Sequence, residues 1–421
     1  MARSKRARNL LYFDHWTVGI HNFARLHPLL ERAGIEASLL HAGSFKHLKC
    51  PEVQTVDGIE AIDISHFGTR FVRRALERLR PDALLMLDCS FMLDRAVILA
   101  CRGLGIRSIY LQHGVLPDFD AFAAIVPMKD AVYKEDRLRR AIPYLKFDLP
   151  NYFLSGLHLD PRFLLDSAVY RYCLGLFREP TQYLFYPPPS PENLTDVALV
   201  YSNADRDRHV EGFGYRPDQV IVVGNPNLDD AMAQRYSSRA ECARAEGIPD
   251  APYVLYLEDA FVGDGWKGWT VASRRAHLKE VEDCCRDAGY HLVVKLHPQS
   301  ARERSPDDFA GLTNSSVLGQ ARIADLVRFA ERCVGHISST VRLPILMGKP
   351  LLVPQWGISA DLPRYYGEEV VTYCRTIDDF AARLKVNSFE YSRDAYIAHE
   401  MTYSDGKAAE RIVQAIADQM R

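Results

Sequence analysis

The stretch VVKLHPQS, residues 293–300, places residues that could bind an anion directly after a run typical of a buried strand. Lys295 can meet the charge of a phosphate, and an N–H group of His297 can donate a hydrogen bond to a phosphate oxygen. Pro298 ends the strand and fixes the corner. The alternative is a strand that simply stops at a proline, so the neighbouring motifs must decide between a binding site and a turn.

A second stretch, HISST, brings three consecutive hydroxyl side chains to the end of another predicted strand. Ser338, Ser339 and Thr340 are expected to open a helix, so that their hydroxyls and the first free N–H groups form an anion cradle. Ser and Thr are also common N-caps, but one cap does not need three hydroxyls. Glu258 and Asp259 follow a further strand of the same half, where they would bind a ribose or an acceptor hydroxyl, or cap a loop.

The first half of the sequence carries acidic residues and histidines where its predicted strands end. Such groups are candidates for proton transfer. A structural role is the alternative for each: His113 as an ordinary loop histidine, His15 bonded to its own loop, and Asp88 as the cap of a helix beginning near Met92. We expect catalytic groups among Asp14, Asp88 and His113, with His113 the leading candidate, and regard Asp118 and Asp120 as further candidates.

Strand and helix signals alternate through the first 115 residues and again from about residue 195 to the end. This rhythm is typical of parallel sheets covered by helices. Ligands bind beyond the carboxyl ends of the strands in such sheets, which is where the polar groups lie. We therefore predict an α/β fold of two Rossmann-like doubly wound domains facing a cleft, residues 1–228 and 229–421. A closing amphipathic helix at 406–420 is expected to return to the first domain.

Composition narrows the class of protein. The 421 residues are 48% hydrophobic, enough for two cores, and the net charge of −2 argues against a general nucleic-acid binder. Nine scattered cysteines without C-x-x-C favour reduced thiols over disulfides or zinc, and no H-E-x-x-H spacing occurs. We expect no metal, no signal peptide, no membrane span and a cytoplasmic location. Solvated faces are the first interpretation of the basic segments 70–80 and 134–146, with peripheral contact to the inner membrane face as the alternative.

Four stretches together resemble bacterial GT-B glycosyltransferases of capsule and lipopolysaccharide synthesis, including sialyl-, Kdo- and CDP-glycerol-type transferases. These stretches are VVKLHP, HISST before GKPLLVP, VVGNPNLD at 222–229 and DGKAAERI at 405–412. The resemblance covers most of residues 9–418. It implies that the His-Pro and Ser-Ser-Thr motifs bind the phosphate and ribose of a donor nucleotide. The acidic-acidic-glycine motif of sialyltransferases has no clean copy in the first half.

The resemblance implies transfer of a sugar from a nucleotide donor, CMP- or UDP-linked, to a surface-glycan or lipid-linked acceptor, without a cofactor or metal. A CMP-linked ulosonic acid such as Kdo or a sialic-type acid is one candidate donor. A UDP-sugar 2-epimerase is the alternative, although the His-Glu-Ala-Gly stretch of those enzymes is replaced here by QHGVLPDF. A non-catalytic nucleotide-sugar-binding protein is a third class.

Overall fold

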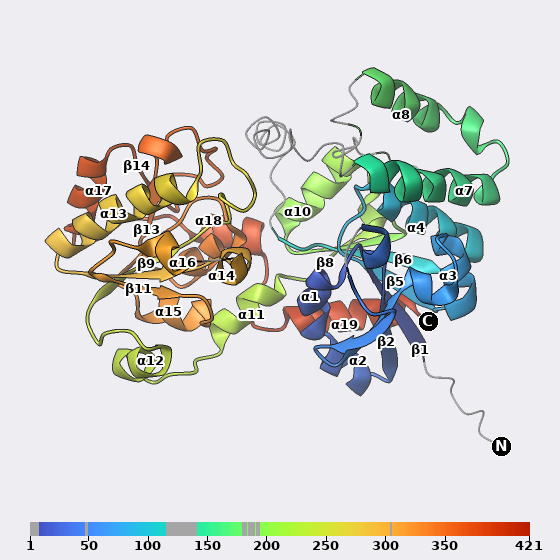
Figure 1. Ribbon diagram of the computed structural model, residues 1–421. Coiled ribbons are helices and arrows are strands. Elements are labelled where there is room, and N and C mark those ends of the chain that lie inside the picture. Colours follow the sequence, from blue (N-terminus) through green and yellow to red (C-terminus); the bar gives the residue numbers. More distant parts are fainter. Residues whose placement is uncertain are drawn as a thin grey trace. The chain divides into compact units, whose positions relative to one another are not determined.

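The computed structural model describes residues 8–46, 49–114, 141–178, 183, 190, 194–303 and 305–421. The chain forms two compact units, shown in Figure 1. Unit 1 comprises Met1–His113, Arg137–Asn225 and Lys407–Arg421, and unit 2 comprises Gly114–Asp136 and Pro226–Gly406. The division after Asn225 lies close to the predicted boundary at 228. Residues Lys407–Arg421 belong to unit 1, as expected for a closing helix that returns to the first domain, although the predicted domain range counted them with the second.

Unit 1 is built on an eight-stranded sheet in the order β3-β4-β2-β1-β5-β6-β7-β8, in which only the β3–β4 pair is antiparallel. Its strands are β1 Arg8–Asp14, β2 Ile35–His41, β3 Val53–Val56, β4 Ile59–Asp63, β5 Ala83–Met86, β6 Arg107–Leu111, β7 Val197–Val200 and β8 Val220–Val222. Its helices are α1 Ile20–Ala24, α2 His27–Arg32, α3 Val72–Leu79, α4 Met92–Leu104, α7 Leu149–Leu159, α8 Ser167–Arg178, α10 Asn203–Arg208 and α19 Ala408–Gln419.

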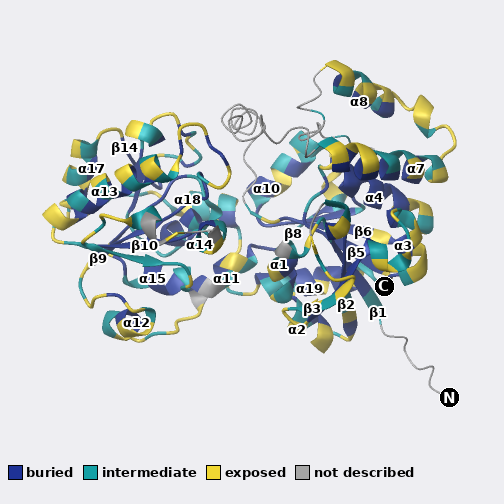
Figure 2. Cartoon of the chain, viewed as in Figure 1, coloured by how far each residue is buried: buried dark blue, intermediate teal, exposed yellow. Residues whose placement is uncertain are grey.

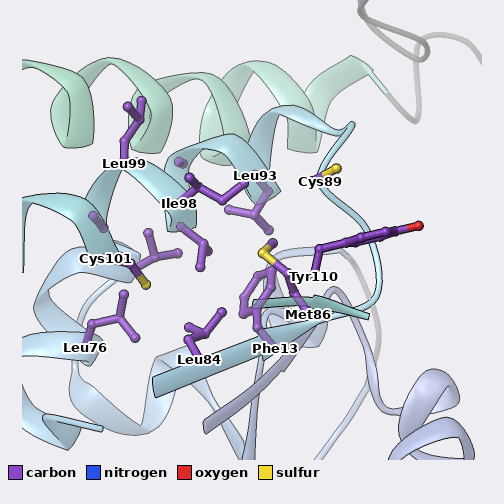
Figure 3. Packing of buried hydrophobic residues seen from close by; sticks show 14 of the residues in the cluster. Phe13, Leu76, Leu84, Met86, Cys89, Leu93, Ile98, Leu99, Cys101 and Tyr110 are labelled. Carbon is purple, nitrogen blue, oxygen red and sulfur yellow. The ribbon is translucent and has the colours of Figure 1, made fainter. Parts of the chain in front are cut away.

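Helices cover both faces of this sheet because its strands bury side chains in both directions. Along β1, Leu11 and Phe13 enter one core with α3, α4 and α7, part of which is shown in Figure 3. Leu10 and Tyr12 enter the opposite core with α1, α2 and α19. This alternation is the period of two that a strand imposes. The sheet is doubly wound.

Unit 2 is a six-stranded sheet in the order β11-β10-β9-β12-β13-β14, and all its strand pairs are parallel. The strands are β9 Tyr253–Leu257, β10 His291–Lys295, β11 Ser315–Leu318, β12 Arg332–Val334, β13 Leu351–Pro354 and β14 Thr372–Cys374. The helices are α11 Pro226–Met232, α12 Arg239–Glu246, α13 Val271–Asp287, α14 Pro298–Glu303, α15 Ile323–Phe329, α16 Arg342–Leu346, α17 Ile377–Leu384 and α18 Asp394–Tyr396. Buried cores lie on both faces of this sheet as well. Figure 2 shows the central strands of each unit as largely buried.

These two sheets confirm the predicted fold class of two Rossmann-like α/β domains. No helix within the described ranges combines the length and the apolar character needed to cross a membrane.

Helix α19 explains why the C-terminal residues join unit 1. Ile412 and Ile416 are fully buried and pack in the core that contains Leu10 and Tyr12. Arg411 Nε also donates a hydrogen bond of 2.9 Å to the carbonyl of Val223. An apolar stripe at helical spacing needs a partner, and the sheet of unit 1 supplies it.

We expect Ile412→Ala and Ile416→Ala each to lower the free energy of unfolding by about 2–5 kcal/mol, because each leaves a cavity in this core. Urea denaturation followed by circular dichroism measures the change. Gln414→Ala, on the exposed side of the same helix, is the control and should stay within about 0.5 kcal/mol of the parent. Unchanged stability in both isoleucine variants would contradict a core role for α19.

Candidate functional site

The corner after β10 holds His297 at the carboxyl edge of the unit 2 sheet. Strands β9, β10 and β12 are neighbours in that sheet and run parallel, so the residues that follow them share one edge. Pro298 opens helix α14 and does more than stop a strand. The predicted donor residues Glu258, Asp259, His297 and Ser338 therefore lie along a common edge.

The ring of His297 has a defined tautomer when neutral. The backbone N–H of Gln299 donates to His297 Nδ1 over 3.3 Å, so the ring proton is carried by Nε2. Burial lowers the pKa of His297, and this effect outweighs the nearby negative charges of Asp259 and Asp264. His297 is thus a neutral N–H donor at pH 7.

The contacts of Glu258 give it a different role from the predicted ribose contact. Its Oε2 accepts the backbone N–H of His297 over 2.9 Å, and its Oε1 accepts a bond of the same length from Arg274. Arg274 also donates to Asp308 over 3.0 Å. Burial raises the pKa of Glu258 although these partners oppose the shift. Because both carboxylate oxygens are occupied, we assign Glu258 to positioning the His-Pro corner.

The contacts of Lys295 also differ from the phosphate contact that the sequence predicts for it. It is only 7% exposed, and its Nζ donates to the carbonyls of Leu296 and Gly319 over 2.8 and 3.1 Å. Burial lowers the pKa of this ammonium group. Lys295 therefore ties together the segments that follow β10 and β11, and its ammonium group is bonded to their carbonyls.

The residues of HISST form a short 3-10 turn where the sequence predicts the start of a helix. Ser338 is the N-cap of a single 3-10 turn, Ser339–Val341, and the five-residue helix α16 follows it. Ser338 Oγ accepts the N–H of Thr340 over 3.4 Å and contacts Thr340 Oγ1 at 3.0 Å. Ser338 has the capping role, while Ser339 and Thr340 remain half-buried at the sheet edge.

Asp259 lies beside a buried histidine that follows β12. His336 Nδ1 is 3.5 Å from Asp259 Oδ2, and His336 Nε2 is 3.2 Å from Ser359 Oγ. The contacts from Ser359 through His336 to Asp259 resemble those of a Ser–His–Asp triad. Ser359 is fully buried, however, so no substrate can reach its hydroxyl. Asp259 Oδ2 is itself buried and, apart from its approach to His336, has no hydrogen-bond partner among the described residues.

A separate group of acids and histidines occupies the carboxyl edge of the unit 1 sheet. Asp14 ends β1, and its Oδ1 accepts the N–H of His15 over 2.6 Å. His15 Nε2 lies 2.8 Å from Asp94 Oδ1. Burial lowers the pKa of His15, but the charge and hydrogen bond of Asp94 outweigh it and the net shift is upward. His15 and Asp94 form a buried ion pair that sequence analysis did not pair.

His113 follows β6, next to the strand that ends before Asp88. His113 Nδ1 donates to the carbonyl of Leu87 over 3.1 Å, because a carbonyl can only accept. Its Nε2 then carries the lone pair that a general base requires, and the residue is exposed. Asp88 Oδ1 accepts the N–H of Ser90 over 2.7 Å in a turn, and the capping carboxylate of α4 is Asp94.

Burial raises the pKa of both Asp14 and Asp88, with Asp94 adding to each shift and His113 opposing it. The structure thus brings Asp14, Asp88 and His113 into one electrostatic group. Asp118 and Asp120, the remaining candidates, lie outside the described residues. Sequence reasoning missed the Lys46–Asp148 ion pair, which also acts on the pKa of His15, since 102 positions separate its members.

Among the described residues, one set of metal-ligand types converges: His41 Nδ1, Cys50 Sγ and Asp63 Oδ2 lie within 4.8 Å of one another. The Asp63 carboxylate accepts N–H groups from Ser44 and Ser65 over 3.0 and 2.8 Å as a turn cap. Burial raises its pKa, but hydrogen bonds from His41 and Ser44 outweigh burial and hold it well below its usual range. These bonds account for the group as a structural cap.

No protein-family model matches the sequence, and no curated protein is similar enough to match. Solved structures do resemble it. The glycotransferase of kitacinnamycin is 16% identical with a TM-score of 0.55, and the match covers 99% of this chain and 100% of the other. UDP-GlcNAc 2-epimerase from Neisseria meningitidis, bound to UDP-GlcNAc, is 11% identical with a TM-score of 0.54, covering 97% and 100%.

The wall teichoic acid polymerase TagF is a further similar structure, 12% identical with a TM-score of 0.54 over 99% of this chain and 89% of the other. At such identities these similarities establish a fold and leave the activity to chemical argument. The chain has the two-domain Rossmann-like α/β fold of these proteins.

The His15–Asp94 pair predicts a pH-dependent stability. A histidine whose pKa is raised on folding adds stability below its unfolded pKa of about 6.5, and this contribution disappears as the pH rises through the folded value. His15→Gln should therefore cost more unfolding free energy at pH 6 than at pH 9, measured by urea denaturation. His66→Gln, at a more exposed histidine 3.7 Å from Glu52, is the control with a small, flat effect. Equal costs of His15→Gln at both pH values would contradict the charged pair.

Proposed function

We propose that this protein is a glycosyltransferase that uses a nucleotide sugar as its donor. The observation that carries the proposal is His297, whose backbone is held by Glu258 and whose ring presents an Nε2–H group at the carboxyl edge of the unit 2 sheet. Open parallel sheets bind ligands at this edge. Glycosyltransferases and a UDP-GlcNAc-bound epimerase with the same fold support a nucleotide-sugar substrate.

In this proposal unit 2 binds the donor. His297 donates a hydrogen bond from Nε2 to the donor's diphosphate or phosphate, and strengthens it as negative charge develops on the leaving group. Pro298 holds the corner, Ser339 and Thr340 supply hydroxyls to phosphate or ribose, and Asp259 accepts from a ribose hydroxyl. The neutral state of His297 suits a hydrogen-bond donor, which does not require a charge. Stabilisation of the leaving group by these donors needs no metal ion.

Unit 1 would act on the acceptor. His113 Nε2 takes the proton of the attacking hydroxyl, and its Nδ1–H bond to the Leu87 carbonyl holds the ring in the required tautomer. Asp14 and Asp88 are the alternative bases, since burial raises the pKa of each carboxyl and so increases its basicity. A base in this role contributes roughly 10²–10⁴-fold in rate.

We infer that the acceptor is a surface glycan or a lipid-linked saccharide of capsule or lipopolysaccharide synthesis, made in the cytoplasm. A CMP-linked ulosonic acid and a UDP-linked hexose are the two donor classes. Thermal stabilisation by a panel of nucleotide sugars distinguishes them, because a ligand that binds only the folded state raises the melting temperature. Stabilisation by none of the panel would contradict a nucleotide-sugar donor.

A UDP-sugar 2-epimerase is the second candidate, and three epimerases among the similar structures favour it. The two functions differ in their products. A transferase with donor and acceptor yields an extended glycan, whereas a hydrolysing epimerase converts the donor alone to a free sugar with inverted configuration at carbon 2. Appearance of that free sugar without an acceptor would establish the epimerase and exclude the transferase proposal.

We expect His297→Ala to weaken nucleotide binding roughly ten- to a hundredfold, the loss of one hydrogen bond to a charged group. His297→Gln keeps a side-chain N–H donor and should retain part of this affinity. Isothermal titration with the stabilising nucleotide measures the change. His291→Ala is the matched control, since His291 begins the same strand at its opposite end. Affinity within about twofold of the parent in His297→Ala would remove this residue from the donor site.

His113→Ala should lower turnover by roughly 10²–10⁴-fold while nucleotide affinity changes less than about twofold. Single-turnover rates and equilibrium binding separate the two quantities. Asp14→Asn and Asp88→Asn are measured beside it. A large loss of turnover in one of these variants, with His113→Ala unaffected, would assign the base to a carboxylate.

A further inference from the structure

Exposed apolar side chains are concentrated in one part of unit 1. Of eleven large hydrophobic residues exposed in the described chain, seven lie between Ile142 and Phe177, and the others are scattered at Trp16, Val53, Phe91 and Tyr403. This segment comprises α7, the 3-10 turn Phe163–Leu165 and α8. Figure 2 shows exposed residues along α8 and the turn, at the edge of the unit. Apolar groups gathered in this way indicate an interaction surface.

Helix α8 has a buried side and an exposed apolar side. Val169 and Tyr172 are buried against the rest of the unit. Tyr170 and Phe177 are seven residues apart, which places them on one helix face, and they are 66% and 87% exposed. Leu165, just before the helix, is 83% exposed. We call Leu164, Leu165, Tyr170 and Phe177 the α8 apolar surface.

Positive charge surrounds this surface. Arg162, Arg171 and Arg178 alternate with its apolar residues along the chain. Both acidic residues of the same stretch bind backbone: Asp160 accepts the N–H of Arg162 over 2.8 Å, and Asp166 accepts the N–H of Ala168 over 2.7 Å. Both aspartates keep their charge, so the stretch from Asp160 to Arg178 carries three arginines against two carboxylates, an excess of one positive charge.

A basic groove adjoins the same elements. It has a volume of about 290 Å³ and lies between α3 and α7, and its lining includes Phe71, Arg73, Arg74, Glu77 and His158. Arg73 is paired with Glu77 at 3.0 Å, whereas the exposed Arg74 lies over the ring of Phe71. An arginine fork at the mouth of a groove suits a phosphate group.

We propose that the α8 apolar surface and the α3–α7 groove dock this protein on a bilayer containing anionic lipids. Leu164, Leu165 and Phe177 enter the boundary between headgroups and acyl chains, and Arg74 and Arg178 contact headgroup phosphates. A second copy of the chain fits less well. A two-fold interface would set the same surface against itself and bring Arg162, Arg171 and Arg178 of both copies together.

This inference rests on the proposed function for its purpose: a lipid-linked acceptor is presented at a membrane surface, and docking confines the enzyme to the same layer. The binding itself can be measured without any sugar. The full chain is sedimented with vesicles of phosphatidylcholine, or of phosphatidylcholine mixed with phosphatidylglycerol. We expect binding to the mixed vesicles that weakens as salt rises, because exposed charges are screened.

Two variants separate the apolar and the charged contributions. Leu165→Ser combined with Phe177→Ser should reduce vesicle binding at least roughly tenfold, and Arg74→Gln or Arg178→Gln about fivefold each at low salt. Val53→Ser combined with Tyr403→Ser removes exposed apolar residues elsewhere and should bind as the parent does. Absence of parent binding, or equal binding by the Leu165/Phe177 variant, would overturn the inference.

Light scattering after size exclusion tests the competing occupant. A concentration-dependent dimer in the parent that disappears in the Leu165/Phe177 variant would assign the surface to a second copy and overturn membrane docking. Nucleotide binding in solution is measured on the same samples. Lost vesicle binding with intact nucleotide binding contradicts only the docking surface, whereas absent nucleotide binding with intact docking contradicts only the proposed function.

Discussion

Buried carboxylates hold the backbone where the parallel strands end, and the candidate site residues depend on these bonds. An N–H group freed at the end of a strand costs about 1–3 kcal/mol if it is buried without a partner. Glu258 takes the N–H of His297, Asp14 takes that of His15, and Asp88 takes that of Ser90. The corner geometry of each sheet edge is thereby fixed by side chains that look, in sequence, like candidates for chemistry.

Because these carboxylates bind backbone N–H groups, fewer polar side chains are left that could contact a substrate. Both carboxylate oxygens of Glu258 accept bonds, from Arg274 and His297, and Lys295 donates to two carbonyls. His297 and His113 each have one ring nitrogen bonded to a backbone group. They differ in the state of the other ring nitrogen. His297 presents an N–H donor, and His113 presents a lone pair. In the proposed mechanism, one residue type would thus supply leaving-group stabilisation in one unit and proton acceptance in the other.

Strands and major helices were predictable because their apolar periodicity is strong. The buried strand predicted before His297 is β10, and the helix predicted to begin near Met92 is α4. The β3–β4 hairpin was missed because β3 has only exposed and half-buried residues, although Asp57-Gly58 is a typical two-residue hairpin turn. The positions of the site residues at the sheet edges could be predicted, because these residues follow the ends of predicted strands. Side-chain direction could not, because whether Lys295 turns inward depends on carbonyls contributed by a segment distant in sequence, near Gly319.

The position of α19 has a consequence for the order of folding. Domains generally fold as they leave the ribosome, with the first-made domain leading. Here the sheet of unit 1 is synthesised early, but the core on one of its faces includes Ile412 and Ile416. Helices α1 and α2 cover part of that face, but the part covered by α19 stays open while the whole of unit 2 is made. The unit that begins first is completed last, and a nascent chain halted within unit 2 carries an open apolar face that a chaperone would recognise.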